Sequence, residues 1–404
     1  MLYQLNLREV TYALCEALDY VGIDDIKHGK RVAYIACEIA KKLGWRQSKL
    51  DKVLLMTMLH DCGVSSTDVH HSIVSHLDWE DSQIHCAQGA QLLQSVPIYS
   101  EFADIIAFHH THWSQFLPQI DDDVKLCANL IYLSDRIDAM RSQFGAHLSH
   151  EKEYIRSIIQ RYTPELFSPK ISEAFLEISH MDSFWYYLDS DPLHCYFSDW
   201  IDQGKIETVP FSVLKKIASM FANIVDAKEN IPEQHPCLCV ATLARNLAEV
   251  CNLSIHIQEE IELAALLQDL GRLRIPDSIY EKNISLSDDE QMRIRRQGFD
   301  TQIILCQIKG FEHIAKIISF YHKVVNERKG IACKVSAEKI ISLEASILVI
   351  ANTFQTFLQD SAQGDITRYA IDTMLKAIAE QAQLETSTID TIASYLETSY
   401  VEAL

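Results

Sequence analysis

The stretch KLDKVLLMTMLHDCG, residues 49–63, joins an amphipathic helix to a His-Asp pair at its end. Apolar residues recur at three- and four-residue intervals up to His60, which predicts a helix, and Gly63 then ends it. The same periodicity runs through residues 30–43, 101–110, 124–141 and 150–162. Metal ligands at helix ends that point into a shared core are typical of helical bundles. The sequence therefore predicts an all-α fold.

Histidines and aspartates recur at regular intervals around this pair. They lie 24 to 32 residues apart, which is about one helix, a turn and a second helix. The set comprises His28, His60, Asp61, His85, His109, His110 and Asp135. Imidazoles and carboxylates suit Mn, Fe and Zn ions, and seven such groups exceed the needs of one tetrahedral zinc. The pattern predicts a site for two or more metal ions.

The composition narrows the classes of function. The chain has 404 residues, which suggests two or three domains, and a net charge of −20, which disfavours binding to nucleic-acid polymers or anionic membranes. Its 11 cysteines form no CxxC pair, which is typical of free thiols in a reducing cytosol. The first 22 residues read as an amphipathic helix, and no apolar run approaches the ~18 residues of a membrane span. We expect a cytoplasmic protein.

The second half of the sequence repeats the first in outline. The run ELAALLQDLG ends as VLLMTMLHDCG does, about one helix-turn-helix after a histidine. The corresponding residues are His235, Gln268, Asp269, Gly271, Gln297, Tyr321, His322 and Asn352. Two tandem helical bundle domains of one kind explain the repeat. We expect the first over residues 1–180, a connector over 181–210 and the second over 211–404.

These residues resemble the HD superfamily of metal-dependent phosphohydrolases, and within it the HD-GYP branch. The resemblance runs from about Gly22 to about Phe357, and its most specific stretch is GRLRIPDSIYEK at 271–282. FSPKISEAFLEIS at 167–179 and LSDDEQMRIRRQGFDT at 286–301 also resemble stretches of that family.

The resemblance implies an all-α cytosolic phosphodiesterase whose substrate is cyclic di-GMP or cyclic GMP-AMP. It assigns all seven residues of the set as ligands of two divalent ions, with Fe or Mn favoured. It also assigns His60 and Asp61 as the catalytic residues. Water activated by the metal ions would attack phosphorus. Asp24 occupies the place of a ligand to a third ion. Asp138, one turn after Asp135, either orients a ligand residue by a hydrogen bond without touching the metal or serves as a cap or salt-bridge partner.

The sequence also departs from the family pattern. Val64 replaces a lysine that would meet the substrate phosphate, Thr111 replaces a glutamate, and the G-Y-P signature is absent. In the second half, Gln268 and Asn352 replace a histidine and an aspartate, so we expect no metal there. Cys62 and Cys86 each follow a ligand and are interpreted as buried apolar residues, because adjacent side chains usually point apart.

Three functions remain open from the sequence. The first is cyclic-dinucleotide hydrolysis in the N-terminal domain, with substrate-binding residues not identified. The second is a catalytically weak or inactive signalling or scaffold protein, and the third is hydrolysis of another phosphate ester. The second domain would bind a protein partner or a nucleotide, brace the first domain, or form a homodimer. His70 fits no ligand position and is interpreted as structural.

Overall fold

The computed structural model describes residues 2–23, 27–143, 148–228, 236–280, 282, 285–328, 342–360, 371–376, 378 and 384–400. The described elements are helices apart from two short strands, β1 (Leu2–Asn6) and β2 (Ile206–Pro210), which pair in a two-stranded sheet. The prediction of a helical protein is confirmed. None of the described helices is long and apolar enough to cross a membrane.

The helix expected from the first residue begins later than predicted. β1 precedes α1 (Leu7–Asp19), and the Asn6 side chain caps that helix by accepting a hydrogen bond from the Arg8 amide. Helical periodicity did not predict the strand, because its pairing partner β2 lies about 200 residues away in the sequence.

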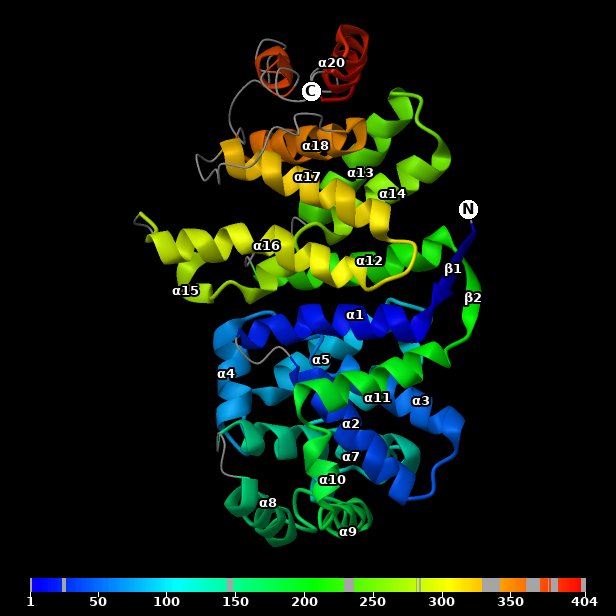
Figure 1. Ribbon diagram of the computed structural model, residues 1–404, viewed down its shortest axis with the longest axis vertical. Helices are drawn as coiled ribbons and strands as arrows, with labels where there is room; N and C mark the ends of the chain where they lie inside the picture. Colours follow the sequence, from blue (N-terminus) through cyan, green and yellow to red (C-terminus); the bar gives the residue numbers. More distant parts are fainter. Residues whose placement is uncertain are drawn as a thin grey trace. The chain divides into compact units, whose positions relative to one another are not determined.

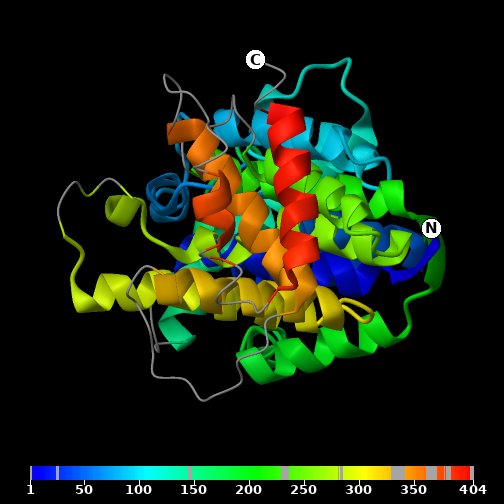
Figure 2. The same ribbon diagram turned by 90° about the horizontal axis from the view of Figure 1, so that it is seen from above.

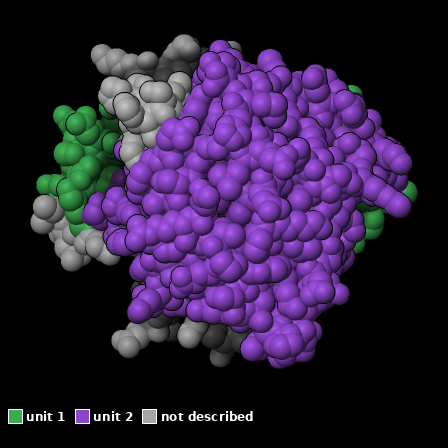
Figure 3. Space-filling view, turned by 90° about the horizontal axis from the view of Figure 1, so that it is seen from below, with its two compact units in different colours: residues 1–3, 209–272, 279–404 green, residues 4–208, 273–278 purple. Residues whose placement is uncertain are grey.

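The chain divides into two compact units, coloured separately in Figure 3. The first, here the N-terminal unit, comprises residues 4–208 and 273–278. The second, here the C-terminal unit, comprises residues 1–3, 209–272 and 279–404. We propose that the domain limits expected at 181–210 correspond to the change of unit after Thr208.

The N-terminal unit is built around α2 (His28–Lys42), whose segment VAYIACEIA is almost wholly buried. This helix packs against α1, α3 (Gln47–Met58), α7 (Asp122–Ser142) and α9 (Pro169–Ile178) (Figure 1). The remaining helices of the unit are α4 (Thr67–Ser75), α5 (Ser82–Gln94), α6 (Ala103–Ala107), α8 (Leu148–Arg161), α10 (Asp182–Tyr186) and α11 (Ser190–Asp202). The helices predicted from periodicity are therefore present, with ends shifted by a few residues.

The C-terminal unit is a second helical bundle. Its α13 (Pro236–Val250) packs against α14 (Ile255–Leu267) and α18 (Leu343–Asp360), and α14 also meets α17 (Glu312–Arg328). Its other helices are α12 (Phe211–Lys228), α16 (Asp288–Cys306) and α20 (Thr386–Tyr400), the last drawn in red in Figure 2. The short α15 (Asp277–Tyr280) begins in the segment that belongs to the N-terminal unit.

One close backbone approach occurs in both units, at positions that the sequence repeat pairs. A Cβ on Gly63 would lie 2.0 Å from the carbonyl oxygen of His85, and a Cβ on Gly271 would lie 2.1 Å from that of Gln297. Only glycine permits such an approach. The two halves thus share a local three-dimensional feature as well as a sequence pattern, which supports the interpretation as tandem repeats.

Candidate metal centre

The seven residues of the predicted ligand set come from five elements of the N-terminal unit. His28 begins α2, His60 and Asp61 lie in the turn after α3, His85 is in α5, His109 and His110 follow α6, and Asp135 is in α7. Six of them are at most 4 % exposed, whereas the Asp61 side chain is 13 % exposed. Asp61 is therefore the member of the set most accessible from outside.

The Asp61 carboxylate lies at the middle of the set. Its Oδ2 is 3.3 Å from His60 Nε2 and 3.7 Å from His28 Nε2. Its Oδ1 is 3.6 Å from His85 Nε2 and 3.8 Å from His109 Nε2. One oxygen thus faces each pair of imidazoles, so the carboxylate could contribute an oxygen to a cation on either side.

Asp135 extends the cluster on its other side. Its Oδ1 lies 3.3 Å from His28 Nε2, and its Oδ2 lies 3.6 Å from His110 Nε2. The buried guanidinium of Arg136 donates to Asp135 Oδ2 from Nη2 at 2.6 Å. Burial raises the pKa of Asp135, but Arg136 and His28 lower it more, so this carboxyl is ionised.

Backbone carbonyls orient two of the imidazoles. His60 Nδ1 donates to the Thr57 carbonyl oxygen at 2.8 Å, and His109 Nδ1 donates to that of Ile106 at 2.7 Å. A carbonyl can only accept, so Nδ1 carries a proton in both rings. His60 has a pKa of about 4, so its Nε2 faces Asp61 as a lone pair, whereas Cys86 and Asp61 outweigh burial and raise the pKa of His109 above its usual value. Such hydrogen bonds are typical of metal-binding histidines.

Asp138 orients His28 and also forms an ion pair. Its Oδ2 accepts from His28 Nδ1 at 2.9 Å, and Arg31 donates to both oxygens, at 2.6 and 2.8 Å. Burial raises the pKa of Asp138, but Arg31 and His28 lower it well below its usual value. Asp138 thus bonds to the His28 ring and forms a salt bridge with Arg31 in the same structure. Asp24 lies outside the described residues.

The pKa values of several members of the set favour the protonation states that bind a cation. Burial lowers the pKa of His60 to about 4, and burial together with His109 lowers that of His110 well below its usual value. Burial raises the pKa of Asp61, but the surrounding histidines, His60 first, lower it more. For His28, burial lowers the pKa, but Asp135 and Asp138 raise it above its usual value. Neutral imidazoles beside ionised carboxylates are the forms that bind metal.

Several buried atoms of the centre make no hydrogen bond. They are His28 Nε2, His60 Nε2, Asp61 Oδ1, His110 Nε2 and Asp135 Oδ1. A buried polar atom without a partner costs about 1–3 kcal/mol, so five in one cluster need an explanation. Divalent cations would satisfy all of them at once. The residues present therefore fit a metal centre.

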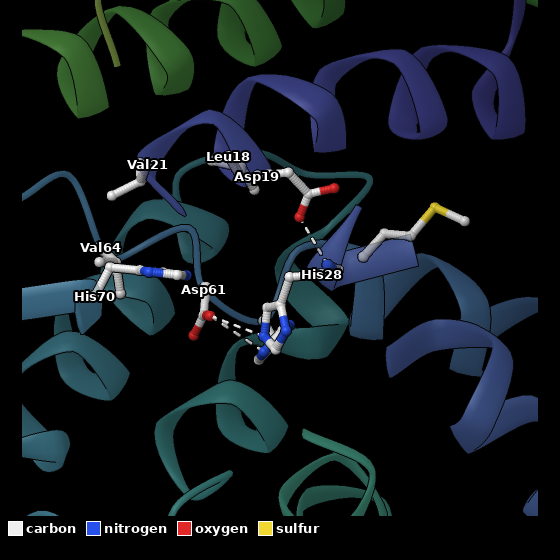
Figure 4. Close-up of a pocket in the computed structure, with 10 residues that line it drawn as sticks. Leu18, Asp19, Val21, His28, Asp61, Val64 and His70 are labelled. Carbon is white, nitrogen blue, oxygen red and sulfur yellow. Dashed lines mark hydrogen bonds and ion pairs between the residues drawn. The ribbon is translucent and has the colours of Figure 1, made fainter. Parts of the chain in front are cut away.

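A pocket opens onto one side of the centre. Its lining includes His28, His60, Asp61, Val64 and His70. Figure 4 shows the His70 side chain directed towards Asp61 and His28, and the His28 and His70 ring centroids are 6.0 Å apart. From its spacing along the chain, which matches no ligand position, His70 is interpreted as a structural residue. Its place in the pocket results from the packing of α4.

Cys86 lies closer to the centre than the sequence argument expected. It is buried, as predicted, but its Sγ is 3.8 Å from His85 Nε2. Burial raises the pKa of this thiol, but His109 and His85 lower it to about 6. Cys62 behaves differently: its Sγ donates to the Gly89 carbonyl at 3.6 Å, and burial raises its pKa. Both thiols follow a proposed ligand in the sequence, so the sequence alone does not show which of them lies beside the imidazoles.

In the C-terminal unit, side-chain amides occupy the corresponding place. Gln268 and Asn352 exchange two hydrogen bonds of 2.9 Å, and His322 Nε2 donates to the Gln268 carbonyl at 2.8 Å. The Gln268 and Asn352 amides therefore bond to each other, and His322 Nε2 bonds the backbone of Gln268. Within the described ranges, groups of three potential ligands occur only in the N-terminal unit. His235 lies outside those ranges.

The Arg31–Asp138 pair leads to a prediction about pH. Replacing Asp138 with asparagine should lower the free energy of unfolding of the metal-free protein by about 3–5 kcal/mol at pH 7, because the buried ion pair between Arg31 and Asp138 is lost. The folded-state pKa of Asp138 is depressed. The stabilisation is therefore present above about pH 4, the usual value, and is lost as the pH falls further.

Urea unfolding from pH 3 to 7 measures this effect. The difference between the wild type and Asp138→Asn should shrink below about pH 4. Asp122→Asn is the matched control, because Asp122 starts the same helix with its side chain 93 % exposed, and should change stability by no more than about 0.5 kcal/mol. A difference that is constant with pH would contradict the assignment.

A helical bundle with clustered histidines and aspartates defines this unit as a helical domain with a candidate metal site. Comparison with known proteins agrees. The family described as HD domain matches residues 25–140 and, through a second HD-domain family, residues 216–383. The chain therefore belongs to the HD-domain proteins and carries two HD regions.

Its relatives include phosphodiesterases of cyclic dinucleotides. The 3'3'-cGAMP-specific phosphodiesterase 1 of Vibrio cholerae is 28 % identical over 370 residues, covering 88 % of this chain and 84 % of the relative. The cyclic di-GMP phosphodiesterase of Thermotoga maritima is 24 % identical over 185 residues, 44 % of this chain and 50 % of the relative. The crystal structure of the V. cholerae cyclic GMP-AMP phosphodiesterase V-cGAP3 aligns over 98 % of both chains with a TM-score of 0.65 at 20 % identity, which shows a shared fold.

Proposed function

We propose that the N-terminal unit is a metal-dependent phosphodiesterase that hydrolyses a cyclic dinucleotide, cyclic GMP-AMP or cyclic di-GMP. The observation that carries the proposal is the Asp61 carboxylate, with one oxygen facing each pair of imidazoles. Two-metal sites bridged in this way favour displacement at phosphorus. The named activity of the V. cholerae relative, which aligns over most of this chain, supports the class of substrate.

In this proposal the ligands divide between two divalent ions, Fe or Mn. His28, His60 and Asp135 would hold one ion, His85, His109 and His110 would hold the other, and Asp61 would contribute to both. Bound ions would lower the pKa of a water molecule and neutralise charge on the phosphate.

The protein's own groups keep this arrangement in place. The carbonyls of Thr57 and Ile106 hold His60 and His109 in the tautomer that presents Nε2. Asp138 does the same for His28, and Arg136 keeps Asp135 ionised. Asp61, the most exposed member of the set, lines the pocket, so a phosphodiester would approach the centre from this side. No protein nucleophile is needed.

The nature of Val64 favours a second candidate, a signalling or scaffold protein with weak or no turnover. This side chain lines the pocket, is 2 % exposed and offers no hydrogen-bond donor to a phosphate. Hydrolysis of another phosphate ester is the remaining alternative. For the C-terminal unit we propose a role without metal, as a surface for a protein partner or a homodimer, since Gln268 and Asn352 bond to each other.

The test is hydrolysis of a substrate panel by the full chain supplied with Mn²⁺ or, without oxygen, Fe²⁺. The panel holds cyclic GMP-AMP, cyclic di-GMP and nucleoside monophosphates, and the control is the double variant His60→Ala/Asp61→Ala. We expect turnover of a cyclic dinucleotide that the control lacks. Turnover of monophosphates alone would replace the proposed substrate, and no turnover by folded, metal-loaded protein would favour the signalling role.

A further inference from the structure

Cys86 shares a small buried space with two of the proposed ligands. His85 and Cys86 follow one another in the first turns of α5, and His109 approaches from the end of α6. Their Nε2, Sγ and Nε2 atoms all lie within 4.8 Å of one another. His85 Nε2 is 3.2 Å from His109 Nε2 and 3.8 Å from Cys86 Sγ. All three side chains are at most 2 % exposed.

These separations match the edges of a small coordination shell. With metal–nitrogen bonds of about 2.0–2.1 Å and metal–sulfur bonds of about 2.3 Å, tetrahedral edges are about 3.3 Å between nitrogens and about 3.6 Å between nitrogen and sulfur. The distances of 3.2 and 3.8 Å agree to a few tenths of an ångström. Asp61 Oδ1, buried and without a hydrogen bond, stands 3.6 and 3.8 Å from the two imidazoles as a fourth donor.

We propose that Cys86 is a sulfur ligand of the ion held by His85, His109 and Asp61. The inference rests on the proposed metal centre and deepens it. In the structure the thiol donates to the Ser82 carbonyl at 3.2 Å. When the metal–sulfur bond forms, this proton is released to solvent and the thiolate binds the ion.

A sulfur donor changes which ion this position prefers. Thiolates favour Zn and Fe over the harder Mn, whereas imidazoles and carboxylates alone discriminate less. His110 is the third imidazole proposed for this ion, and its Nε2 also lies 3.6 Å from Asp135 Oδ2. The two positions of the centre then differ in chemistry, one with nitrogen and oxygen donors and the other with sulfur as well.

The experiment uses cobalt as a probe of sulfur coordination. The full-length protein is stripped of metal, loaded with Co²⁺ without oxygen, and its bound cobalt is counted. The near-ultraviolet spectrum of the wild type should show a thiolate-to-cobalt charge-transfer band. Cys86→Ala and Cys86→Ser should lose this band, and their affinity for Zn²⁺ should fall by at least about tenfold.

The matched control is Cys62→Ala. Cys62 is also buried beside a proposed ligand, but its Sγ faces the Gly89 carbonyl, so this variant should keep the band. A wild type that binds cobalt without the band would overturn the inference even if no variant folds. A band that survives in folded Cys86→Ala would overturn it as well.

The spectrum also separates this inference from the proposed function. A band without hydrolysis of any substrate would uphold sulfur ligation and count against the phosphodiesterase. Hydrolysis by the cobalt- or manganese-loaded protein, together with a cobalt spectrum that lacks the band, would uphold the phosphodiesterase and overturn sulfur ligation.

Discussion

Replacing Asp61 with alanine should abolish both metal binding and phosphodiester hydrolysis. This carboxylate is the one group that faces both pairs of imidazoles, with contacts of 3.3 to 3.8 Å to four histidines. Its loss leaves His85 and His109 without the carboxylate oxygen that they face, while His28 and His110 keep Asp135. Turnover should fall by at least about 10³-fold, and bound metal, measured by elemental analysis, should fall below one ion per chain.

The control for this variant lies in the second repeat. Asp269 corresponds to Asp61 in sequence, but it is paired with Arg272 at 3.1 Å beside the Gln268–Asn352 amide pair. Asp269→Ala should leave turnover within about twofold and metal content unchanged. Loss of activity in a folded Asp269→Ala protein would mean that the C-terminal unit contributes to catalysis, and activity retained in Asp61→Ala would refute the mechanism.

The second large effect should come from Gly63→Ala. A Cβ at this position would lie 2.0 Å from the His85 carbonyl oxygen and 2.7 Å from the Gly89 amide nitrogen, so α5 must move away from the turn that carries His60 and Asp61. Such overpacking costs about 1–3 kcal/mol or more. Because the moving helix carries His85, the folded variant should also bind less metal. Urea unfolding and metal content of the folded fraction measure the two effects.

Gly271→Ala is a matched control, since its Cβ would meet the Gln297 carbonyl at 2.1 Å. It should destabilise the C-terminal unit to a similar extent while metal content stays at the wild-type level. Equal loss of metal in both variants would show that the effect of Gly63→Ala is general unfolding and not displacement of His85.

The sequence predicted the helices and the candidate ligands because both depend on which residue types follow one another over a short stretch of chain. Periodicity placed His60-Asp61 at the end of a helix, and α3 ends at Met58, two residues before the pair. Regular spacing then predicted that His85 and Asp135 return to the same core. In the second half, the replacement of a histidine by Gln268 was visible from the residue alone.

Other features depended on contacts between distant segments. β1 formed because Ile206–Pro210 returned to pair with it, and His70 reached the pocket because α4 packs beside η1 (Tyr20–Gly22). His28 is positioned by Asp138, which lies 110 residues away in the sequence. Asp138 is held in turn by Arg31, one helical turn after His28.

The sequence by itself determined which elements are helical and which side chains could hold a metal, because 3.6-residue periodicity and residue chemistry are local properties. Only the tertiary structure decided which atoms meet. It brought the Cys86 thiol to 3.8 Å from His85 Nε2 and joined Gln268 to Asn352. Rotamers and helix packing set such distances, and they depend on neighbours that are far away along the chain.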